Sequence, residues 1–361
     1  METKKARKKI YHYFIGIDVS KNELDFAVVK DQAMILHKEI LNSVEAILEF
    51  VAELKKISGF RVSKALFCLE DSGFYSNHVL NTLKKLKAFV IVENPQKIKK
   101  SQGLVRGKTD KIDALRIAQF AQKNKDELRL WVSRRPVLLL LKNLISTRER
   151  LLGISVILRT PLKEQLSYIS KGIHHQSALS CKKSLVAVTV DLESINLAIK
   201  GLIDGDERLK SIYHLITSVP GVGPICAYQI ILCTNEFLDI TDPRKFACYA
   251  GVAPFKNESG RFIGKARVSH YSNKKVKTLL HMAAITAIRY DAEIKAYYER
   301  KTKGEGKPKM AVINAVRNKV ILRVFACFRQ DRTYIRSYEY PVRQEAVKDI
   351  QVFSACPVIV S

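Results

Sequence analysis

The order of strand-like and helix-like segments between residues 13 and 100 constrains the fold of this chain more than any other feature. The first segment, Tyr13–Val19, is almost continuously apolar, which is typical of a strand buried on both faces. Asn22 and the Asp31–Gln32 pair are turn formers, and Ser43 is suited to cap a helix. The sequence predicts strands at 13–19, 23–30 and 33–40, a helix at 43–57, a strand at 65–69, a helix at about 74–87, a strand at 89–92 and a helix from Pro95.

Three strands, then helix, strand, helix, strand and helix, is the order of the ribonuclease-H-like fold. Its mixed sheet gathers carboxylates at the ends of the first and fourth strands and on the last helix. Asp18 ends the first predicted strand and Glu70 ends the fourth. Asp110 and Asp113 are three residues apart, so they share one face of the helix predicted to start near Thr109. We therefore expect an α/β domain over residues 13–127 that brings these four acids together.

A group of acids is unexpected in this strongly basic chain, which carries 62 Lys and Arg against 35 Asp and Glu and has a formal net charge of +27. Each acid has a structural explanation by itself: Asp18 can form a turn, Asp110 can cap a helix, and Asp113 can pair with Lys111 or Arg116. Together they offer hard oxygen ligands, which suit Mg²⁺ and leave room for water and phosphate. We predict a Mg²⁺ site for phosphoryl transfer.

The basic excess is spread over the whole chain, so a polyanion is the expected partner, with binding that weakens steeply with salt. A basic surface without a partner is the alternative. Cations crowd beside the last two acids, where they can hold a nucleic-acid backbone. They are Lys97, Lys99, Lys100, Arg106, Lys108 and Lys111.

The seven cysteines are scattered and include no Cys-x-x-Cys pair, so neither a zinc ribbon nor a disulfide framework is expected. They fit a reducing cytoplasm. The start of the chain is not a secretory signal, and no apolar run approaches the length of a membrane span. The sequence predicts a soluble cytoplasmic protein.

Beyond residue 127 the predicted structure is mainly helical. Residues 128–210 carry a leucine stripe among basic residues, which predicts a coiled-coil-like helical hairpin, interrupted by the polar stretch Lys171–Gln176. The stripe fits packing within the chain or a dimer seam. A second compact, mainly helical domain is expected at 211–330. Residues 1–12 form a basic arm, and 331–361 resemble a tail.

Val219-Pro220-Gly221-Val222-Gly223 has the pattern of a helix-hairpin-helix turn. Gly221 and Gly223 let the backbone approach a ligand closely, and amide groups at the start of the second helix can meet a phosphate. Such a contact is blind to nucleic-acid sequence. The alternative is a tight connection between two helices that binds nothing.

A polar loop with Ser259 and Gly260 follows Gly251-Val252-Ala253-Pro254. A Ser-Gly pair in such a loop is usually a turn. Ser259 is also flanked by Arg261, Lys265 and Arg267, a setting in which a serine could attack a phosphodiester. No local His-Asp pair activates it, since His270 is eleven residues away and unsupported.

These motifs together resemble the DEDD transposases of insertion-sequence family one hundred and ten, relatives of the Piv DNA invertases, over roughly residues 13–330. The matching segments are Gly16–Lys21, Glu70–Tyr75, Lys108–Ala114, Val219–Gly223, Gly251–Pro254 and Ser259–Gly260. One departure is Tyr271-Ser272-Asn273, where the family often has Gly-Asn; Asn273 and the following Lys274 and Lys275 remain.

The resemblance implies a RuvC-like N-terminal domain that binds Mg²⁺ through Asp18, Glu70, Asp110 and Asp113. It also implies that Ser259 attacks DNA and forms a phosphoserine link, so that strand exchange needs no ATP. Relatives form dimers and tetramers through the helical middle region, and some use a bridge RNA that pairs with donor and target DNA. The predicted function is therefore transposition, with nucleic-acid contacts that also include Lys274 and Lys275.

Two other hypotheses about the function are also compatible with the sequence. A metal-only RuvC-like junction nuclease would use water as the nucleophile, with Ser259 only shaping a turn. A non-catalytic nucleic-acid-binding protein would use the hairpin motif and the basic surface, and its four acids would tolerate substitution.

Overall fold

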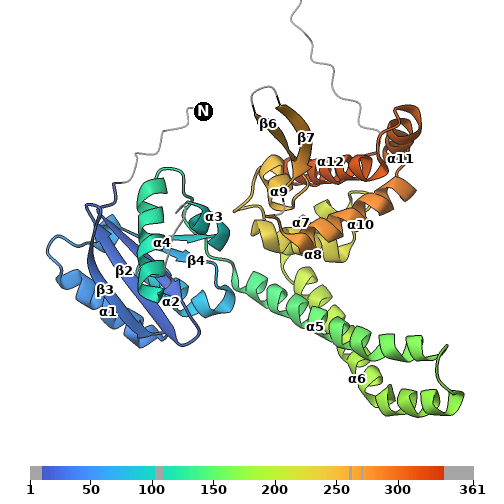
Figure 1. Cartoon of the computed structure of the whole chain (residues 1–361), viewed down its shortest axis with the longest axis horizontal. Coiled ribbons are helices and arrows are strands. Elements are labelled where there is room, and N and C mark those ends of the chain that lie inside the picture. The colour runs from blue at the N-terminus through green and yellow to red at the C-terminus, as the bar shows by residue number, and fades with distance from the viewer. Residues whose placement is uncertain (1–9, 102–108, 260–261, 270, 337–361) are drawn as a thin grey trace, which may run out of the picture. The chain divides into compact units, whose positions relative to one another are not determined.

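The computed structural model describes residues 10–101, 109–259, 262–269 and 271–336. The chain divides into two compact units, Met1–Arg135 and Pro136–Ser361 (Figure 1). Arg106, Lys108 and Arg261 therefore lie outside the described residues, as do the basic arm up to residue 9 and the tail beyond residue 336. Each unit has its own hydrophobic core.

The first unit is built on a five-stranded mixed sheet with the order β3-β2-β1-β4-β5. The pairs β1–β2 and β2–β3 are antiparallel, whereas β1–β4 and β4–β5 are parallel. This is the predicted ribonuclease-H-like arrangement. Its elements are β1 (Tyr13–Val19), β2 (Glu23–Lys30), β3 (Ala33–Leu41), α1 (Val44–Lys56), a 3₁₀ turn (Val62–Lys64), β4 (Ala65–Glu70), a 3₁₀ turn (Gly73–Ser76), α2 (Asn77–Lys85), β5 (Phe89–Glu93), α3 (Pro95–Lys100) and α4 (Asp110–Asn124).

Helices cover both faces of this sheet (Figure 1). On one face Phe26 and Phe67 pack with Phe50 of α1 and Leu83 of α2, and on the other face α4 is the main cover. Ser43 caps α1, since its side chain accepts a hydrogen bond from the amide of Ala46, as predicted. The apolar pattern and the caps thus explain the layers of this unit.

Among its described residues, the second unit is helical apart from one hairpin of two strands (Figure 1). Its core joins the base of α5, the end of α6 and the helices that follow. Its elements are α5 (Pro136–Gln165), α6 (Lys171–Asp204), α7 (Glu207–Thr217), α8 (Pro224–Thr234), α9 (Pro243–Tyr249), β6 (Pro254–Ser259), β7 (Phe262–Val268), α10 (Lys274–Tyr290), α11 (Ala292–Glu299), a π-helical turn (Arg300–Gly304) and α12 (Lys309–Arg329).

The long helices α5 and α6 run antiparallel, as hydrogen bonds between Arg148 and Asn196 and between Arg159 and Thr189 show. Leu138 and Leu141 at the base of α5 are buried in the core of the unit. The predicted interruption is wrong: the polar stretch from Lys171 begins α6, and the connection lies at residues 166–170. The first residues of a helix need no hydrophobic periodicity, which is why the polar stretch was misassigned.

Candidate functional site: an acidic sheet edge and a serine hairpin

The ends of β1 and β4 place Asp18 and Glu70 at the same edge of the sheet. The two strands are parallel, and Ile17 lies opposite Leu69, so the residues that follow come next to each other at the carboxyl ends of the strands. Both side chains are partly exposed, whereas the residues before them are buried. The change from buried to partly exposed residues at the ends of the strands therefore presents these carboxylates at the rim of the core.

Gly16 brings α4 against β1. A Cβ atom at this position would lie 2.0 Å from the carbonyl oxygen of Ala114 and 2.3 Å from the amide nitrogen of Ala118, so only glycine permits this approach. Thr109 caps the helix by accepting a hydrogen bond from the amide of Ile112 at 3.3 Å. Asp110 and Asp113 occupy the first turn of α4, and the helix dipole favours acids there.

The negative charges of Asp110 and Asp113 act on the carboxyl group of Asp18. Burial raises the pKa of Asp18, and the negative charges of Asp113 and Asp110 raise it further, while a hydrogen bond from the backbone at Val19 opposes the shift. Asp113 also accepts a hydrogen bond at 2.9 Å from Arg116. The edge of the sheet is thus a region of mutual repulsion between carboxylates.

Further acids at this edge were missed by the sequence analysis. In the sheet, Asp18 lies opposite Asp25, and Asp25 lies opposite Glu39, so the three acids form a row across β1, β2 and β3. Asp25 is 7% exposed and lies 2.9 Å from Nε2 of His37. The neighbouring Glu23 and Asp25 raise the pKa of Glu39. Aligning the predicted strands as a hairpin would have revealed this row.

The carboxylates suit a divalent metal in their chemistry and in their common position at the sheet edge. In the described part of the chain, however, no three His, Cys, Asp or Glu side chains are close enough to one another to hold an ion as they stand. To bind an ion, these side chains would have to move, and the ion would compete with the contact between Asp113 and Arg116.

The predicted backbone-binding lysines lie on α3 and α4. Lys97 pairs with Glu93 at 2.6 Å and lies over the ring of Phe120. Lys99, Lys100 and Lys111 are exposed. Asn94 and Pro95 start α3, which carries three of these cations within six residues. This arrangement leaves charged groups at the surface beside the helix that bears Asp110.

Ser259 is the last residue of β6 and pairs with Phe262 in β7, so it ends a strand and is not in the loop expected from the sequence. The flanking Lys265 and Arg267 belong to β7, where Arg267 lies opposite Phe255. The hairpin was missed because Gly, Asn and Ser interrupt the apolar alternation that identifies strands.

Polar contacts fix the base of this hairpin. The side-chain nitrogen of Asn273 donates to the hydroxyl of Tyr249 at 2.8 Å, its backbone amide donates to the carbonyl of Tyr249, and its side-chain oxygen caps α10. Gly251 has a φ of +64°, and a Cβ there would lie 2.4 Å from Oγ of Ser272. The segments 249–253 and 271–273 therefore hold each other in place.

The two glycines of the predicted helix-hairpin-helix turn differ in their surroundings. Gly221 has a φ of +91°, and a Cβ there would lie 2.2 Å from the carbonyl oxygen of Ala283 in α10. Gly223 caps α8, and nothing lies within 4 Å of its would-be Cβ. Packing therefore requires Gly221 but leaves the space at Gly223 open. Nearby in the same unit, Lys274 and Lys275 begin α10, and Lys275 pairs with Glu149.

Two family models match the chain. Residues 15–170 match the DEDD transposases of the IS110 type, and residues 213–299 match the family described as Transposase IS116/IS110/IS902. The described helices include none that is long and apolar enough to cross a membrane.

The chain is also similar to individual proteins and to a solved structure. The pilin gene-inverting protein of Moraxella bovis is 24% identical over 336 residues, which cover 89% of this chain and 97% of that protein. An uncharacterised 44.8 kDa protein of insertion element IS116 from Streptomyces clavuligerus is 28% identical over 138 residues, 36% of this chain and 34% of its own. The RuvC structure of T. thermophilus with a Holliday junction substrate has 16% identity and a TM-score of 0.26, and covers 34% of this chain and all of that one. The family matches show that the chain belongs to the IS110 family of DNA transposases and recombinases.

Proposed function

We propose that this transposase cleaves and rejoins DNA at the ends of its insertion sequence by combining an acidic metal site with a serine nucleophile. The observation that carries the proposal is the packing of α4 directly on Gly16 of β1, which places the first turn of that helix, with Asp110 and Asp113, on the strand that carries Asp18. A protein with a formal charge of +27 gathers negative charge at one sheet edge, where a divalent cation would relieve the repulsion. Ser259, at the end of β6, supplies the second part of the proposal.

Asp18, Glu70, Asp110 and Asp113 are the residues that would hold the metal. Mg²⁺ is our choice because it prefers carboxylates together with water and substrate phosphate. When bound, it would stabilise the charge that develops on a phosphate during displacement. The protein itself orients the ligands: Gly16 holds α4 against β1, and Thr109 fixes the first turn of that helix.

In the proposed reaction Oγ of Ser259 attacks a phosphorus atom of the DNA backbone. The new Oγ–P bond replaces one P–O bond of the strand, and the released oxygen takes up a proton as a hydroxyl. A hydroxyl of the recipient strand then displaces the serine, so the number of phosphodiester bonds is conserved without ATP. Lys265 and Arg267 lie on β7, the partner strand of the serine, and add positive charge to this hairpin.

The proposed partners are DNA at the element ends and target, and a bridge RNA that selects them. The basic composition and the exposed Lys99, Lys100 and Lys111 support backbone contacts. The open space at Gly223, beside the start of α8, supports a close approach of a phosphate to the turn. Base pairing by an RNA would supply the sequence specificity that such contacts lack.

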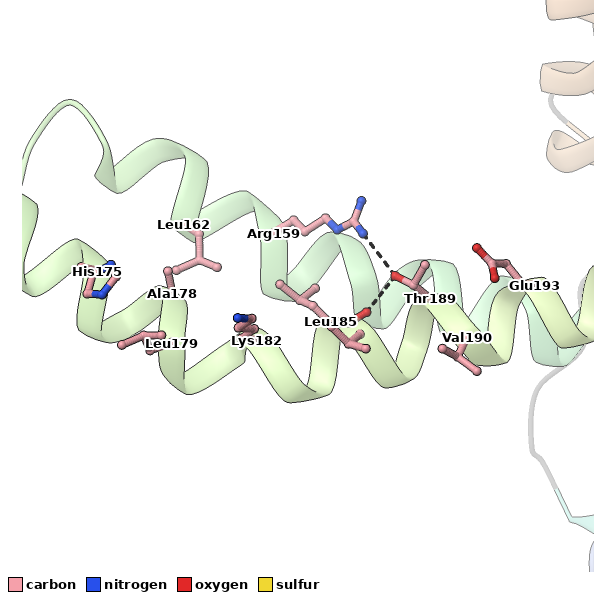
Figure 2. A pocket seen from close by; sticks show the side chains of 11 residues that line it. Arg159, Leu162, His175, Ala178, Leu179, Lys182, Leu185, Thr189, Val190 and Glu193 are labelled. Atoms are coloured by element: carbon pink, nitrogen blue, oxygen red, sulfur yellow. Dashed lines mark hydrogen bonds between the residues drawn. The ribbon is translucent and has the colours of Figure 1, made fainter.

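We further propose a homodimer or homotetramer that uses the hairpin of α5 and α6. Large apolar side chains are exposed along its outer part, including Ile157 (70%), Val186 (56%) and Leu197 (70%). Leu162, Leu179 and Val190 line a groove of about 570 Å³ between the two helices (Figure 2). Exposed apolar surface of this extent is typical of an interaction face.

Light scattering of the purified protein tests the assembly. The variant Val186→Glu should lower the molar mass to that of one chain, because a charge in an apolar interface costs several kcal/mol. Ser180→Glu, on the same helix at an exposed position, is the matched control. A monomeric wild type, or a Val186→Glu variant that keeps the wild-type mass, would contradict this use of the hairpin.

The chemistry is tested by mixing protein, flanking RNA, Mg²⁺ and labelled DNA, and running denaturing gels. We expect a protein–DNA adduct that disappears in Ser259→Ala and persists in the control Ser180→Ala. Asp18→Asn should abolish adduct formation and recombination. Adduct in Ser259→Ala would exclude the serine role, and full recombination by Asp18→Asn would exclude the metal role. Cleavage to free ends without any adduct would favour the metal-only nuclease instead.

A further inference from the structure

Arg317 of α12 is a buried cation without an acidic partner. It is 6% exposed. Its NH2 group lies 2.6 Å from Nδ1 of His281 and its NH1 group donates to Oδ1 of Asn314 at 3.3 Å, whereas Nε has no hydrogen-bond partner. Within the described residues no Asp or Glu pairs with Arg317. A buried charge is costly unless an opposite charge compensates it, so this position is prepared for an anion that arrives from outside.

The contact with Arg317 also fixes the state of His281. A guanidinium group has only donors, so Nδ1 of His281 must be the acceptor, and the neutral ring then carries its proton on Nε2. Burial and the charge of Arg317 both lower the pKa of His281, which keeps the ring neutral. The side chain is partly exposed, and Nε2 has no partner in the described part of the chain. His281 thus offers a donor at the surface with a fixed positive charge behind it.

The surroundings favour a phosphate as the anion. Lys277 and Lys274 precede His281 by one and two turns of α10 and share its face. Neither lysine pairs with an acid among the described residues. A phosphodiester could accept from Nε2 of His281 and be attracted by three positive charges, an arrangement typical of backbone recognition in nucleic-acid-binding proteins.

The cluster is tied to the serine hairpin. The side chain of Asn314, which accepts from Arg317, donates to the carbonyl of Val252 at 2.8 Å. Val252 precedes β6 by two residues, and Ser259 ends that strand, roughly 20 Å further along at the usual rise of a strand. A phosphate at the cluster would therefore lie several nucleotides along the strand from the one that reacts.

We propose that His281 and Arg317, held by Asn314, bind one backbone phosphate of a nucleic-acid strand and so align that strand along the Ser259 hairpin. The site deepens the proposed function and rests on it for the alignment. These residues bind and position the strand; they do not take part in the bond changes.

The variant Arg317→Met tests the proposal because methionine keeps the apolar stem of the arginine side chain and removes its charged guanidinium group. We expect the full-length variant to bind a labelled duplex of arbitrary sequence roughly tenfold more weakly. The slope of log K against log salt between 50 and 200 mM should fall by about 0.9, the loss of one phosphate contact. The melting temperature in phosphate-free buffer should stay equal or rise, since an uncompensated buried charge has gone.

A purely structural role predicts the opposite pattern: a lower melting temperature with an unchanged salt slope, which would overturn the proposal. Arg289→Met, an exposed position on α10, is the control for the loss of one net charge. In a second measurement, the His281 ring signals in NMR should shift when a short single-stranded oligonucleotide is added to the wild type and remain still in Arg317→Met. No shift in the wild type would also overturn it. Because these binding tests need neither Ser259 nor a metal, they fail independently of the proposed chemistry.

Discussion

The two candidate reactive elements are held in place in very different ways. Asp18 lies at the end of a central strand whose preceding residues are fully buried, and Gly16 locks that strand directly against α4. Ser259 ends one strand of a two-stranded hairpin whose base is held by polar contacts of Asn273 and Asn314. The carboxylates are positioned by a core, whereas the serine is positioned by a few hydrogen bonds.

In the proposed mechanism this difference matters, because the two parts would have different tasks. A metal site needs ligands held within a fraction of an ångström, which rigid core elements provide. A nucleophile that must meet first one strand and then another gains from an element that can adjust. Substitutions away from the reactive groups should therefore impair the carboxylate edge by unfolding the first unit. In the Ser259 hairpin they should instead change only the local position of the serine.

The largest expected effect is that of Gly16→Ala. The added Cβ would lie 2.0 Å from a backbone oxygen and 2.3 Å from a backbone nitrogen of α4, and neither can move without displacing the helix. We expect a loss of about 4 kcal/mol in the stability of the first unit, together with loss of DNA cleavage. Differential scanning calorimetry and the gel assay would measure both.

Gly153→Ala is the matched control, since nothing lies within 4 Å of its Cβ position in α5. It should raise stability by about 0.5 to 1 kcal/mol, as alanine is the better helix former. If Gly16→Ala melted like the wild type, the contact between β1 and α4 would not position Asp110 and Asp113.

A pair of substitutions in the turn between α7 and α8 separates packing from binding. Gly221→Ala should cost about 3 kcal/mol, because it combines a positive φ with a Cβ position 2.2 Å from the carbonyl of Ala283. Gly223→Ala should fold normally and bind duplex DNA more weakly, because its methyl group would fill the open space beside α8. Melting curves and anisotropy titrations distinguish them. Unchanged DNA binding by Gly223→Ala would favour a turn that only connects two helices.

The sequence was sufficient to predict the structure where local sequence patterns and core packing favour the same arrangement. The apolar run of β1 and the cap at Ser43 are visible as patterns, and the order of elements led to the ribonuclease-H-like sheet. The prediction of the fold succeeds here because burial fixes both the strand and its register. The use of Asp18, Asp110 and Asp113 as metal ligands was inferred from the same topology and stays a prediction.

The sequence was insufficient to predict features that depend on contacts between segments far apart in the chain. The row formed by Asp18, Asp25 and Glu39 depends on strand register, which is a pairwise property. The β6–β7 hairpin lacks the alternation of a half-buried strand, and the start of α6 at Lys171 is polar. Nothing local to Arg317 indicates that it is buried or that its neighbours on other elements are neutral.

Asn273→Ala probes the polar attachment of the serine hairpin. It removes the cap of α10 and the hydrogen bond to Tyr249, and should lower stability by about 1 kcal/mol. Ser43→Ala removes a comparable cap of α1 in the first unit and is the control. We expect similar losses of stability but a drop in adduct formation only for Asn273→Ala. Equal adduct yields from both variants would show that the hairpin does not depend on this attachment.

The smallest expected effect, and the one of opposite sign, is that of Asp18→Asn on stability without metal. The folded protein raises the pKa of Asp18 through burial and the charges of Asp113 and Asp110. A raised pKa means that the folded protein favours the protonated form of Asp18. The stabilising contribution of that form is complete below the unfolded pKa near 3.8 and is lost as the pH rises through the folded pKa.

At pH 7 the neutral asparagine of Asp18→Asn avoids this loss, so its melting temperature in a chelator should be slightly higher than that of the wild type. At pH 3 the two proteins should melt alike. Mg²⁺ should then stabilise the wild type more than Asp18→Asn, because a ligand that binds only the folded state raises stability by an amount that grows with the logarithm of its affinity. A fall in the metal-free melting temperature of Asp18→Asn at pH 7 would mean that this carboxylate supports the sheet edge, and the site would then be built by its core contacts and not held under repulsion for a cation.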